Sequence, residues 1–569
     1  MNPKDRTLVG SFATKKGAVT PLGEWHIRVD RMLSEAFNSV HLRGKGEKMA
    51  EQERVTYKAF AEIKETLSPQ EERFERWRNT IGLFLGPLVA LILYLTPMPT
   101  LTAKAHTLAA ILGWVVIWWV TEPVPIPVTA LIGPMLCIPF DIASARNVFA
   151  PFSDPIIYLF LGSFILAEAM AAHGLDKRFA YGIMSLKWVG NSSGRILLAY
   201  GAITAAISAW ISNTATTAMM FPIGLGIIYA MADLMMKQTG KKVDPFRLRF
   251  GTGMMLMAAY ASSTGGIGTP VGTPPNLIAI GMLEKLVKVK IPFFQWMLFA
   301  VPIMIVMYVV LFFVMHYIHK PEISQIEGSY EYVSQEKQKL GPWKRGEKNA
   351  LFAFALTVVL WVIPGFLAVL YGTDAPVSKA YNNMIPEAVA ALIGAGLLFA
   401  LPVNWKNREF TITWRQATKI DWGTLLLFGG GLSLGNLMFE TKLAEAVGKG
   451  ILNLSGATSL WGITFIAILI AVIITEVTSN TAAANMVIPV VISLSIAAGV
   501  SPIPPAIGAA LGASLAFMLP VSTPPNAIVY GSGMVPITKM ISTGVYFDIA
   551  SIIVVWTGLR ILLPLLGLA

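Results

Sequence analysis

The chain is poor in the charged residues that keep a soluble protein in solution. Only 14% of its 569 residues are Asp, Glu, Lys or Arg, whereas 54% are apolar. This composition excludes a soluble domain of this size and indicates a polytopic membrane protein. The amino-terminal stretch MNPKDRTLVGSFATKKG carries charges but no apolar core, so it does not read as a cleaved signal peptide.

Cysteine and histidine are also scarce. The single cysteine, Cys137, lies in an apolar run, which excludes a disulfide framework and predicts a buried small side chain. The six histidines form no H-E-x-x-H pair, and His316 and His319, at helical spacing, are more typical of a membrane edge than of a metal site. Without a Walker A lysine motif, ATP-driven transport is disfavoured, and without a nucleophile and base set the chain does not read as an enzyme.

Residues 1–79 form a charged segment with no long apolar stretch. Within it Phe60, Ile63 and Leu67 recur at helical spacing. The letters SPQE at Ser68–Glu71 read as a capping box with proline at the first helical position. We expect two short helices here, in a solvated cytoplasmic segment that leads into the membrane, with an amphipathic anchor lying on the membrane surface as the alternative.

Apolar tracts follow from about residue 80 to the end of the chain, and a bilayer span needs about 20 such residues. One tract, 125–142, is predicted as a full span. Two pairs of tracts, 195–236 and 458–500, have no polar loop between their members, so each pair predicts a re-entrant helical hairpin. The fold class is therefore an all-α polytopic membrane protein with about eleven transmembrane helices and two hairpins, divided into halves at 80–349 and 350–569.

The basic residues indicate how the chain is oriented. With the amino terminus inside, the inner connections carry 20 Lys and Arg and the outer ones carry 8. The asymmetry predicts a cytoplasmic amino terminus and an external carboxyl terminus, in what we take to be a bacterial inner membrane. Lys285, Lys288 and Lys290 fall on the outer side and go against the rule.

An internal repeat is the most informative feature. The stretch SNTATTAMMFPI at Ser212–Ile223 aligns with SNTAAANMVIPV at Ser479–Val490, and GTPPNLIAIG at Gly272–Gly281 aligns with STPPNAIVYG at Ser522–Gly531. Both halves thus carry the same two motifs in the same order. With an odd number of spans between equivalent points, the halves are inverted relative to one another, which brings both motif pairs to one midplane site.

The TPPN motif has a direct structural meaning. Two successive prolines remove two amide donors and fix φ, so the helix must break, which predicts broken helices within 246–285 and 502–536. Backbone left unsatisfied at this depth is tolerated only where it lines a cavity or meets a ligand. A simple proline kink would explain one copy, but two copies paired with Ser-Asn-Thr favour a site.

The residues of these motifs suit two kinds of ligand. Hydroxyl and amide donors together with helix ends favour an anion, and the same oxygen atoms favour a hard monovalent cation. Neither motif contains Lys or Arg, so helix ends and co-bound cations would balance an anion's charge. Neither contains Asp, Glu or His, which favours sodium over protons. Glu476 is the exception, either as a proton relay or as a carboxyl group bonded to a neighbour.

With these motifs and TEVTSNTA at Thr475–Ala482, residues 80–569 resemble the divalent anion/sodium symporter family, which includes sodium-coupled di- and tricarboxylate transporters. The resemblance implies a homodimer in which each protomer has a scaffold domain and a transport domain that moves as an elevator. The charged leader departs from the compact members of that family, so its role stays open.

The resemblance also implies which residues bind. The first sodium ion would be held by Ser208, Ser212, Asn213 and Gly272, and the second by Thr475, Thr478, Ser479, Asn480 and Ser522. Substrate carboxylates would meet Ser212, Asn213, Thr214, Thr273 and Pro274 from one half, and Ser479, Asn480, Thr481, Thr523 and Pro524 from the other.

The first hypothesis is sodium-coupled uptake of C4-dicarboxylates such as succinate, malate or fumarate, with membrane lipid around the protein and neither an organic cofactor nor nucleic acid. The main alternative is an exchanger of the same family that swaps dicarboxylates without net sodium coupling. Citrate or sulfate as substrate, and a membrane-embedded enzyme or channel, also stay open.

Overall fold

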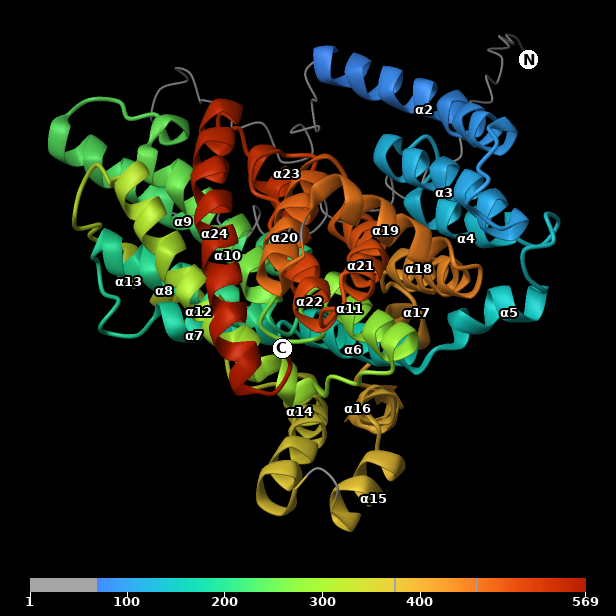
Figure 1. Ribbon diagram of the computed structural model, residues 1–569. Helices are drawn as coiled ribbons and strands as arrows, with labels where there is room; N and C mark the ends of the chain where they lie inside the picture. Colours follow the sequence, from blue (N-terminus) through green and yellow to red (C-terminus); the bar gives the residue numbers. More distant parts are fainter. Residues whose placement is uncertain (1–68, 373–374, 457) are drawn as a thin grey trace, which may run out of the picture. The chain divides into compact units, whose positions relative to one another are not determined.

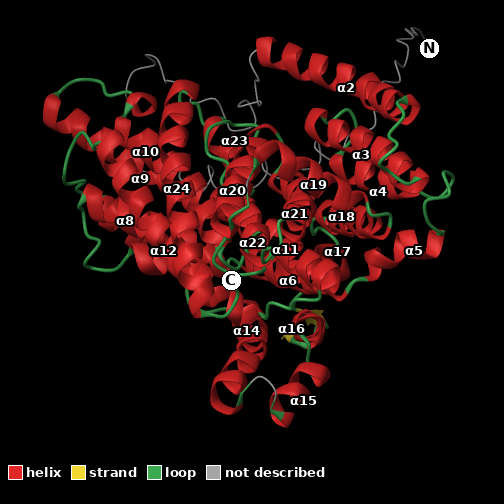
Figure 2. Cartoon of the chain, in the orientation of Figure 1, coloured by secondary structure: helices red, strands yellow, loops and turns green. Residues whose placement is uncertain are grey.

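The computed structural model describes residues 69–372, 375–456 and 458–569 (Figures 1 and 2). This part of the chain is helical apart from one small antiparallel sheet of β1 (Pro402–Asn404) and β2 (Glu409–Phe410). Helix α2 (Pro69–Leu95) begins at the proline that the sequence places first in a helix. The capping serine before it and the predicted helices upstream lie outside the described residues.

Ten described helices are long and apolar enough to cross a membrane, or eleven if α15 (Pro376–Met384) and α16 (Glu387–Ala400), bent by 49°, count as one span. The all-helical polytopic fold is confirmed. Besides α2, the ten are α3 (Ala103–Thr121), α6 (Pro155–His173) with α5 (Ala145–Phe149) and η2 (Ala150–Ser153) leading into it, α9 (Asn213–Thr239), α12 (Phe293–Ile318), α14 (Arg345–Tyr371), α18 (Trp422–Glu440), α20 (Leu460–Val477), α21 (Asn480–Ala497) and α24 (Ile537–Leu565).

Both Ser-Asn-Thr motifs lie where one helix ends and the next begins. Helix α8 (Ser193–Ser208) gives way to α9 at the first motif, and α20 gives way to α21 at the second. Each motif serine caps the helix that follows, because Ser212 Oγ accepts from Ala215 N and Ser479 Oγ accepts from Ala482 N, both at 3.2 Å. The two predicted hairpins are thus helix pairs with the motif at the tip, and their re-entrant course in a membrane stays a prediction.

Both TPPN motifs interrupt a helix, as predicted. Helix α10 (Arg249–Gly266) stops before the first motif and α11 (Pro274–Val287) resumes at its first proline. Helix α22 (Ile503–Gly512) and α23 (Pro524–Tyr530) repeat the arrangement. Proline is tolerated at the first position of a helix because that amide has no partner within the helix, so each break ends at a proline. We call the segments 267–273 and 513–523 the first and second break.

The predicted span 125–142 is wrong in extent. Helix α4 (Ile126–Leu136) covers only 11 residues of it, about 17 Å at 1.5 Å per residue, against a hydrocarbon core of about 30 Å. The helix contains Pro134, ends at Leu136 and is followed by the buried Cys137, whose thiol donates to Gly133 O. Burial of this cysteine is confirmed.

Several short elements have no long apolar run and were not predicted. They are α7 (Leu175–Met184), η3 (Pro245–Arg247), α13 (Ser329–Lys339), α17 (Trp414–Ala417) and α19 (Leu443–Ser455).

The motif-bearing helices form the most buried part of the described chain. Every residue of α10 from Phe250 to Gly266 is buried. By contrast α2, α12, α14 and α24 expose large apolar side chains, among them Phe84, Phe366 and Leu565. Such outward apolar faces fit helices whose solvent is lipid.

Candidate functional site

The two hairpin tips and the two breaks belong to one packed group of helices. Within each half, α10 packs on α8 and α9, and α22 packs on α20 and α21. Between the halves, α11 packs on α21 and α22, whereas α23 packs on α9 and α10. Each broken helix therefore contacts both its own hairpin and the hairpin of the other half (Figure 1).

Each hairpin tip is closed by the same side-chain bond. Ser208 Oγ donates to Asn213 Oδ1 at 2.7 Å, and Thr475 Oγ1 donates to Asn480 Oδ1 at 2.8 Å. The partners are five residues apart in both halves, so the bond joins the last turn of the first helix to the first residue of the next. The structure thus brings together Ser208 and Asn213 of the first predicted sodium site. It also brings together their equivalents in the second site, Thr475 and Asn480.

Each break is held by the asparagine of its TPPN motif. Asn276 Nδ2 donates to the carbonyl oxygens of Gly266 and Thr269 at 3.1 and 2.8 Å. Asn526 Nδ2 donates to the carbonyl oxygens ten and seven residues before it, both at 3.0 Å, which are the equivalent positions. These buried amides satisfy carbonyls that the broken helix leaves free. Neither asparagine was predicted to have a role, although the N of TPPN is present in both copies of the motif.

Gly272 lies against carbonyl oxygens of both the tip and the end of α10. A Cβ at this position would lie 2.5 Å from Gly266 O and 2.8 Å from Ala209 O. A Cβ on Gly266 would in turn lie 2.5 Å from Asn213 Oδ1. Carbonyl and amide oxygens from α9, the tip and the end of α10 therefore gather around the two glycines, and Ser208 reaches the same amide oxygen. Clustered neutral oxygens are the ligands that hard cations take in proteins.

In the second half Ser522 replaces Gly272, and its hydroxyl donates to Leu519 O at 2.6 Å. Thr475 Oγ1 also lies 2.8 Å from Ala513 O at the start of the second break. The hydroxyl of Thr478 points elsewhere, because it donates to Trp119 O on α3 at 2.9 Å. The side chain of Thr478 is therefore not directed at the other residues of the second predicted sodium site.

The residues expected to meet substrate lie at four helix starts. Ser212, Asn213 and Thr214 stand at the start of α9, and their equivalents Ser479, Asn480 and Thr481 at the start of α21. Thr273 and Thr523 are buried, have extended backbone and precede α11 and α23 without capping them. Because Pro274 and Pro275 have no N–H, and likewise Pro524 and Pro525, the free amides come from the hairpin helices, whereas both pairs of helices supply hydroxyl groups.

Comparison with known proteins decides the family. Residues 78–567 match the family described as "Sodium:sulfate symporter transmembrane region". The chain belongs to this family. It is 35% identical over 488 residues to the "Sodium-dependent dicarboxylate transporter SdcS" of Staphylococcus saprophyticus, covering 85% of this chain and 91% of the relative. It is 34% identical over 489 residues to the protein of that name from Staphylococcus aureus strain USA300, with the same coverage.

Among solved structures, the YdaH transporter of Alcanivorax borkumensis superposes with a TM-score of 0.50 at 12% identity, covering 87% of this chain and 98% of that one. At this identity the match speaks for the fold alone. As a member of the sodium:sulfate symporter family, the chain is an integral membrane protein.

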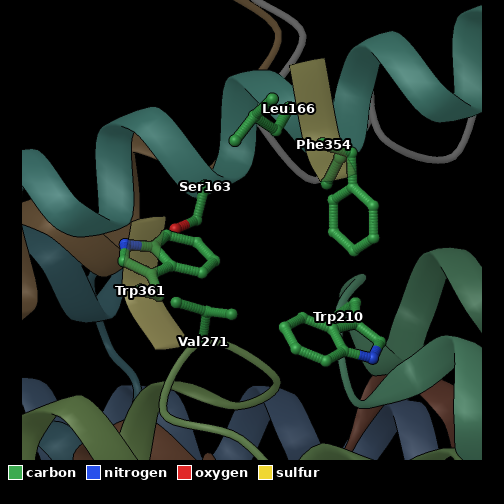
Figure 3. Close-up of a pocket in the computed structure, with 7 residues that line it drawn as sticks. Ser163, Leu166, Trp210, Val271, Phe354 and Trp361 are labelled. Atoms are coloured by element: carbon green, nitrogen blue, oxygen red, sulfur yellow. The ribbon is translucent and has the colours of Figure 1, made fainter. Parts of the chain in front are cut away.

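A small cavity lies between the tip of the first hairpin and helices α6 and α14 (Figure 3). Trp210 from the tip and Val271 from the first break face Phe354 and Trp361 of α14 across this cavity. The rings of Trp210 and Phe354 meet edge to face, with their centroids 5.5 Å apart. The lining is apolar apart from Ser163, whose hydroxyl is already bonded to Leu159 O. The cavity offers nothing to an anion, and the tip meets these helices through apolar contacts.

Glu476 bonds to a neighbouring segment of its own half. Its carboxylate accepts from the backbone amides of Phe517, Met518 and Leu519 at 2.7, 2.9 and 3.2 Å. Of the two roles that the sequence left open, the bonded carboxyl group is the one that this geometry matches. Glu476 therefore fastens the second break to α20, next to the tip that Thr475 closes.

Proposed function

We propose that this protein is a secondary active transporter that couples the entry of sodium ions to the uptake of C4-dicarboxylates such as succinate, malate and fumarate. The observation that carries the proposal is the duplicated oxygen cluster, in which the Ser208–Asn213 and Thr475–Asn480 bonds recur beside a break held by an asparagine. The names of the curated relatives, which are sodium-dependent dicarboxylate transporters, point the same way.

We assign one sodium ion to each half. In the first half the ligands are Ser208, Ser212, Asn213 and Gly272, with backbone oxygens of the tip and break completing the set. In the second half they are Thr475, Thr478, Ser479, Asn480 and Ser522, where Thr478 would contribute through its backbone because its hydroxyl bonds to α3. A cation at each position would be bound by neutral oxygens, so its charge stays available to attract an anion.

The dicarboxylate would lie between the two ions. One carboxylate would meet Ser212, Asn213, Thr214, Thr273 and Pro274, and the other would meet Ser479, Asn480, Thr481, Thr523 and Pro524. The free amides at the starts of α9 and α21 would bring partial positive charge to the anion, which favours its binding without any basic side chain. The moving unit would be the group that carries both hairpins and both broken helices, sliding as an elevator in a homodimer.

The apolar lining between the first tip and α14 supports such a movement. Trp210 and Val271 meet Phe354 and Trp361 without a hydrogen bond between the two sides among the described contacts. Apolar surfaces can slide with little cost, because no directional bond has to be broken and remade.

Labelled succinate uptake into proteoliposomes, with and without a sodium gradient, tests the proposal. We expect uptake to rise steeply with external sodium and to depend on membrane voltage, because two carboxylate charges need more than two sodium ions to move net charge inward. Equal transport in choline buffer, fully retained as exchange of internal for external succinate, would instead identify a dicarboxylate exchanger. Competition by unlabelled citrate and sulfate separates the remaining substrates.

A further inference from the structure

Arg560 lies on an exposed and otherwise apolar face of helix α24, the red helix of Figure 1. Ile549 and Ile553 precede it by about three and two helical turns and are 55% and 56% exposed. Ile561 beside it is also exposed. Because α24 is long and apolar enough to cross a membrane, this face fits lipid as its surroundings. An arginine on such a face is costly unless its charge meets a polar partner.

The described part of the chain offers no partner for this charge. None of the ion pairs found there includes Arg560, and its guanidinium makes no hydrogen bond there either. By contrast, Arg178 and Arg247 each lie against a carboxylate, at 2.9 and 3.5 Å. A guanidinium group carries five N–H donors and stays charged in proteins. Arg560 therefore presents a cation with unused donors to the surface that faces lipid.

An aromatic ring holds this cation in place. The guanidinium of Arg560 lies over the ring of Trp556, one turn earlier on α24, at 5.1 Å from the ring centroid. The indole of Trp556 is fixed in turn from α20, because its Nε1 donates to Trp461 O at 2.9 Å and Phe465 meets it edge to face. Stacking covers one face of the guanidinium and leaves the N–H donors at its edge available. The group is thus oriented before any ligand arrives, which lowers the entropy that binding costs.

The position of Arg560 along α24 places it at the level of lipid headgroups. The helix has 29 residues, so it is about 43 Å long, which matches a bilayer with its headgroups rather than the hydrocarbon core of about 30 Å. Arg560 lies five residues before the last residue of the helix, about 7 Å from its end. The neighbouring helix α20 begins beside it, with Ser459 as its cap and Trp461 in its first turn. Tryptophan rings are typical of this layer, in which the phosphates of phospholipids lie.

We propose that Arg560, stacked on Trp556, binds the phosphate group of a phospholipid and prefers a lipid of net negative charge. A guanidinium fork matches two oxygen atoms of a phosphate, and binding there neutralises a charge that the protein leaves unpaired. A zwitterionic lipid would also bring its own ammonium group, for which no acidic side chain is paired with Arg560 in the described chain. Neither residue belongs to the duplicated motifs, so this inference goes beyond the proposed function.

Native mass spectrometry of the full chain, purified in detergent, tests the inference. The protein is titrated with phosphatidylglycerol or with phosphatidylcholine of the same acyl chains, and the retained lipids are counted. We expect the unaltered protein to retain phosphatidylglycerol at the lower concentration. Arg560→Gln should need about fivefold more of it, the loss expected for one basic residue at an anionic lipid surface, while its retention of phosphatidylcholine stays the same. Arg247→Gln is the matched control, because Arg247 is exposed but paired with Asp244, and it should behave like the unaltered protein.

Arg560→Lys provides a second variant that stays informative if Arg560→Gln does not fold. It keeps the charge but loses the planar fork, so its retention of phosphatidylglycerol should fall between those of the unaltered protein and Arg560→Gln. Full retention in Arg560→Lys would overturn the stacked phosphate site and leave only an unspecific attraction between charges.

Three other results would also overturn the lipid site. The first is equal retention of the two lipids by the unaltered protein, or unchanged retention of phosphatidylglycerol in Arg560→Gln. The second is release of phosphatidylglycerol by inorganic phosphate at equal concentration, which would identify a site for a free anion. The third is a change of oligomeric mass in Arg560→Gln, which would identify an acidic group of a second copy as the partner. Lipid retention is measured without transport, so its outcome is independent of whether the protein moves succinate.

Discussion

Replacing Gly272 with alanine should disable the first sodium site with little loss of folding. The added Cβ would lie 2.5 Å from Gly266 O and 2.8 Å from Ala209 O, and both neighbours are backbone atoms that no rotamer change can move. An ordinary contact needs about 3.4 Å, so the break and the tip would have to separate by several tenths of an ångström. Those two carbonyls are among the oxygen atoms that would surround the ion.

The size of the effect follows from the cost of overpacking. Forcing an extra methyl group into a packed site costs typically about 1–3 kcal/mol. If the protein relieves the strain by moving the carbonyls away, the cost appears as weaker sodium binding, by about 5- to 150-fold. The melting temperature would then fall little.

The dependence of succinate uptake on sodium concentration measures the loss of sodium affinity in Gly272→Ala. We expect the half-activating sodium concentration of Gly272→Ala to rise by one to two orders of magnitude, roughly, within the range that overpacking sets. Gly396→Ala is the matched control, because a Cβ on this α16 glycine meets nothing within 4 Å. Unchanged sodium activation in Gly272→Ala, at equal amounts of reconstituted protein, would refute the placement of the first site.

Three further predictions concern other parts of the site and the fold. Asn213→Ala and Asn480→Ala should each abolish succinate uptake while the protein still elutes as a single species; normal uptake at saturating sodium would mean that the motifs are only structural. Asn526→Ala removes the side-chain donor of the Ala516 carbonyl and one of the donors of the Leu519 carbonyl, and should lower the free energy of unfolding by about 1–3 kcal/mol, measured by thermal unfolding against Asn407→Ala on the exposed β1–β2 loop. Burial raises the pKa of Asp176 to about 6, so the folded state binds its proton more tightly than the unfolded state and loses stability as pH rises through that value. Asp176→Asn should therefore raise the melting temperature at pH 8 and have little effect near pH 4, and an equal shift at both pH values would contradict this.

Local chemistry explains which features of the site could be predicted from the sequence. A proline pair inside an apolar tract must break a helix, and α11 and α23 do resume at Pro274 and Pro524. A serine before Asn-Thr is a good helix cap, and both hairpin tips end in one. These features depend on neighbouring residues, so the sequence alone is enough to indicate them.

Features that depend on distant parts of the chain were missed. The sequence does not indicate that Asn276 reaches back ten residues to a carbonyl, or that the hydroxyl of Thr478 turns to Trp119 on α3. Lys285, which the predicted orientation puts on the outer side against the charge rule, lies 2.9 Å from the carboxylate of Asp154 at the start of α6. Each of these contacts requires helices to be placed in space, which periodicity and composition do not do.

The two halves hold their breaks by different chemistry, and this difference has a consequence for the order of binding. In the first half the hydroxyl of Thr269 donates to Ala209 O, a bond between neutral groups. In the second half Glu476 occupies the position equivalent to Ala209 and brings a negative charge to the same junction. A cation near the second tip therefore experiences a favourable field that the first tip lacks, and low-dielectric surroundings strengthen it. We accordingly expect the second-half sodium site to be the tighter of the two and to fill first, so that the repeat, although symmetric in its backbone, binds its ions in a fixed order.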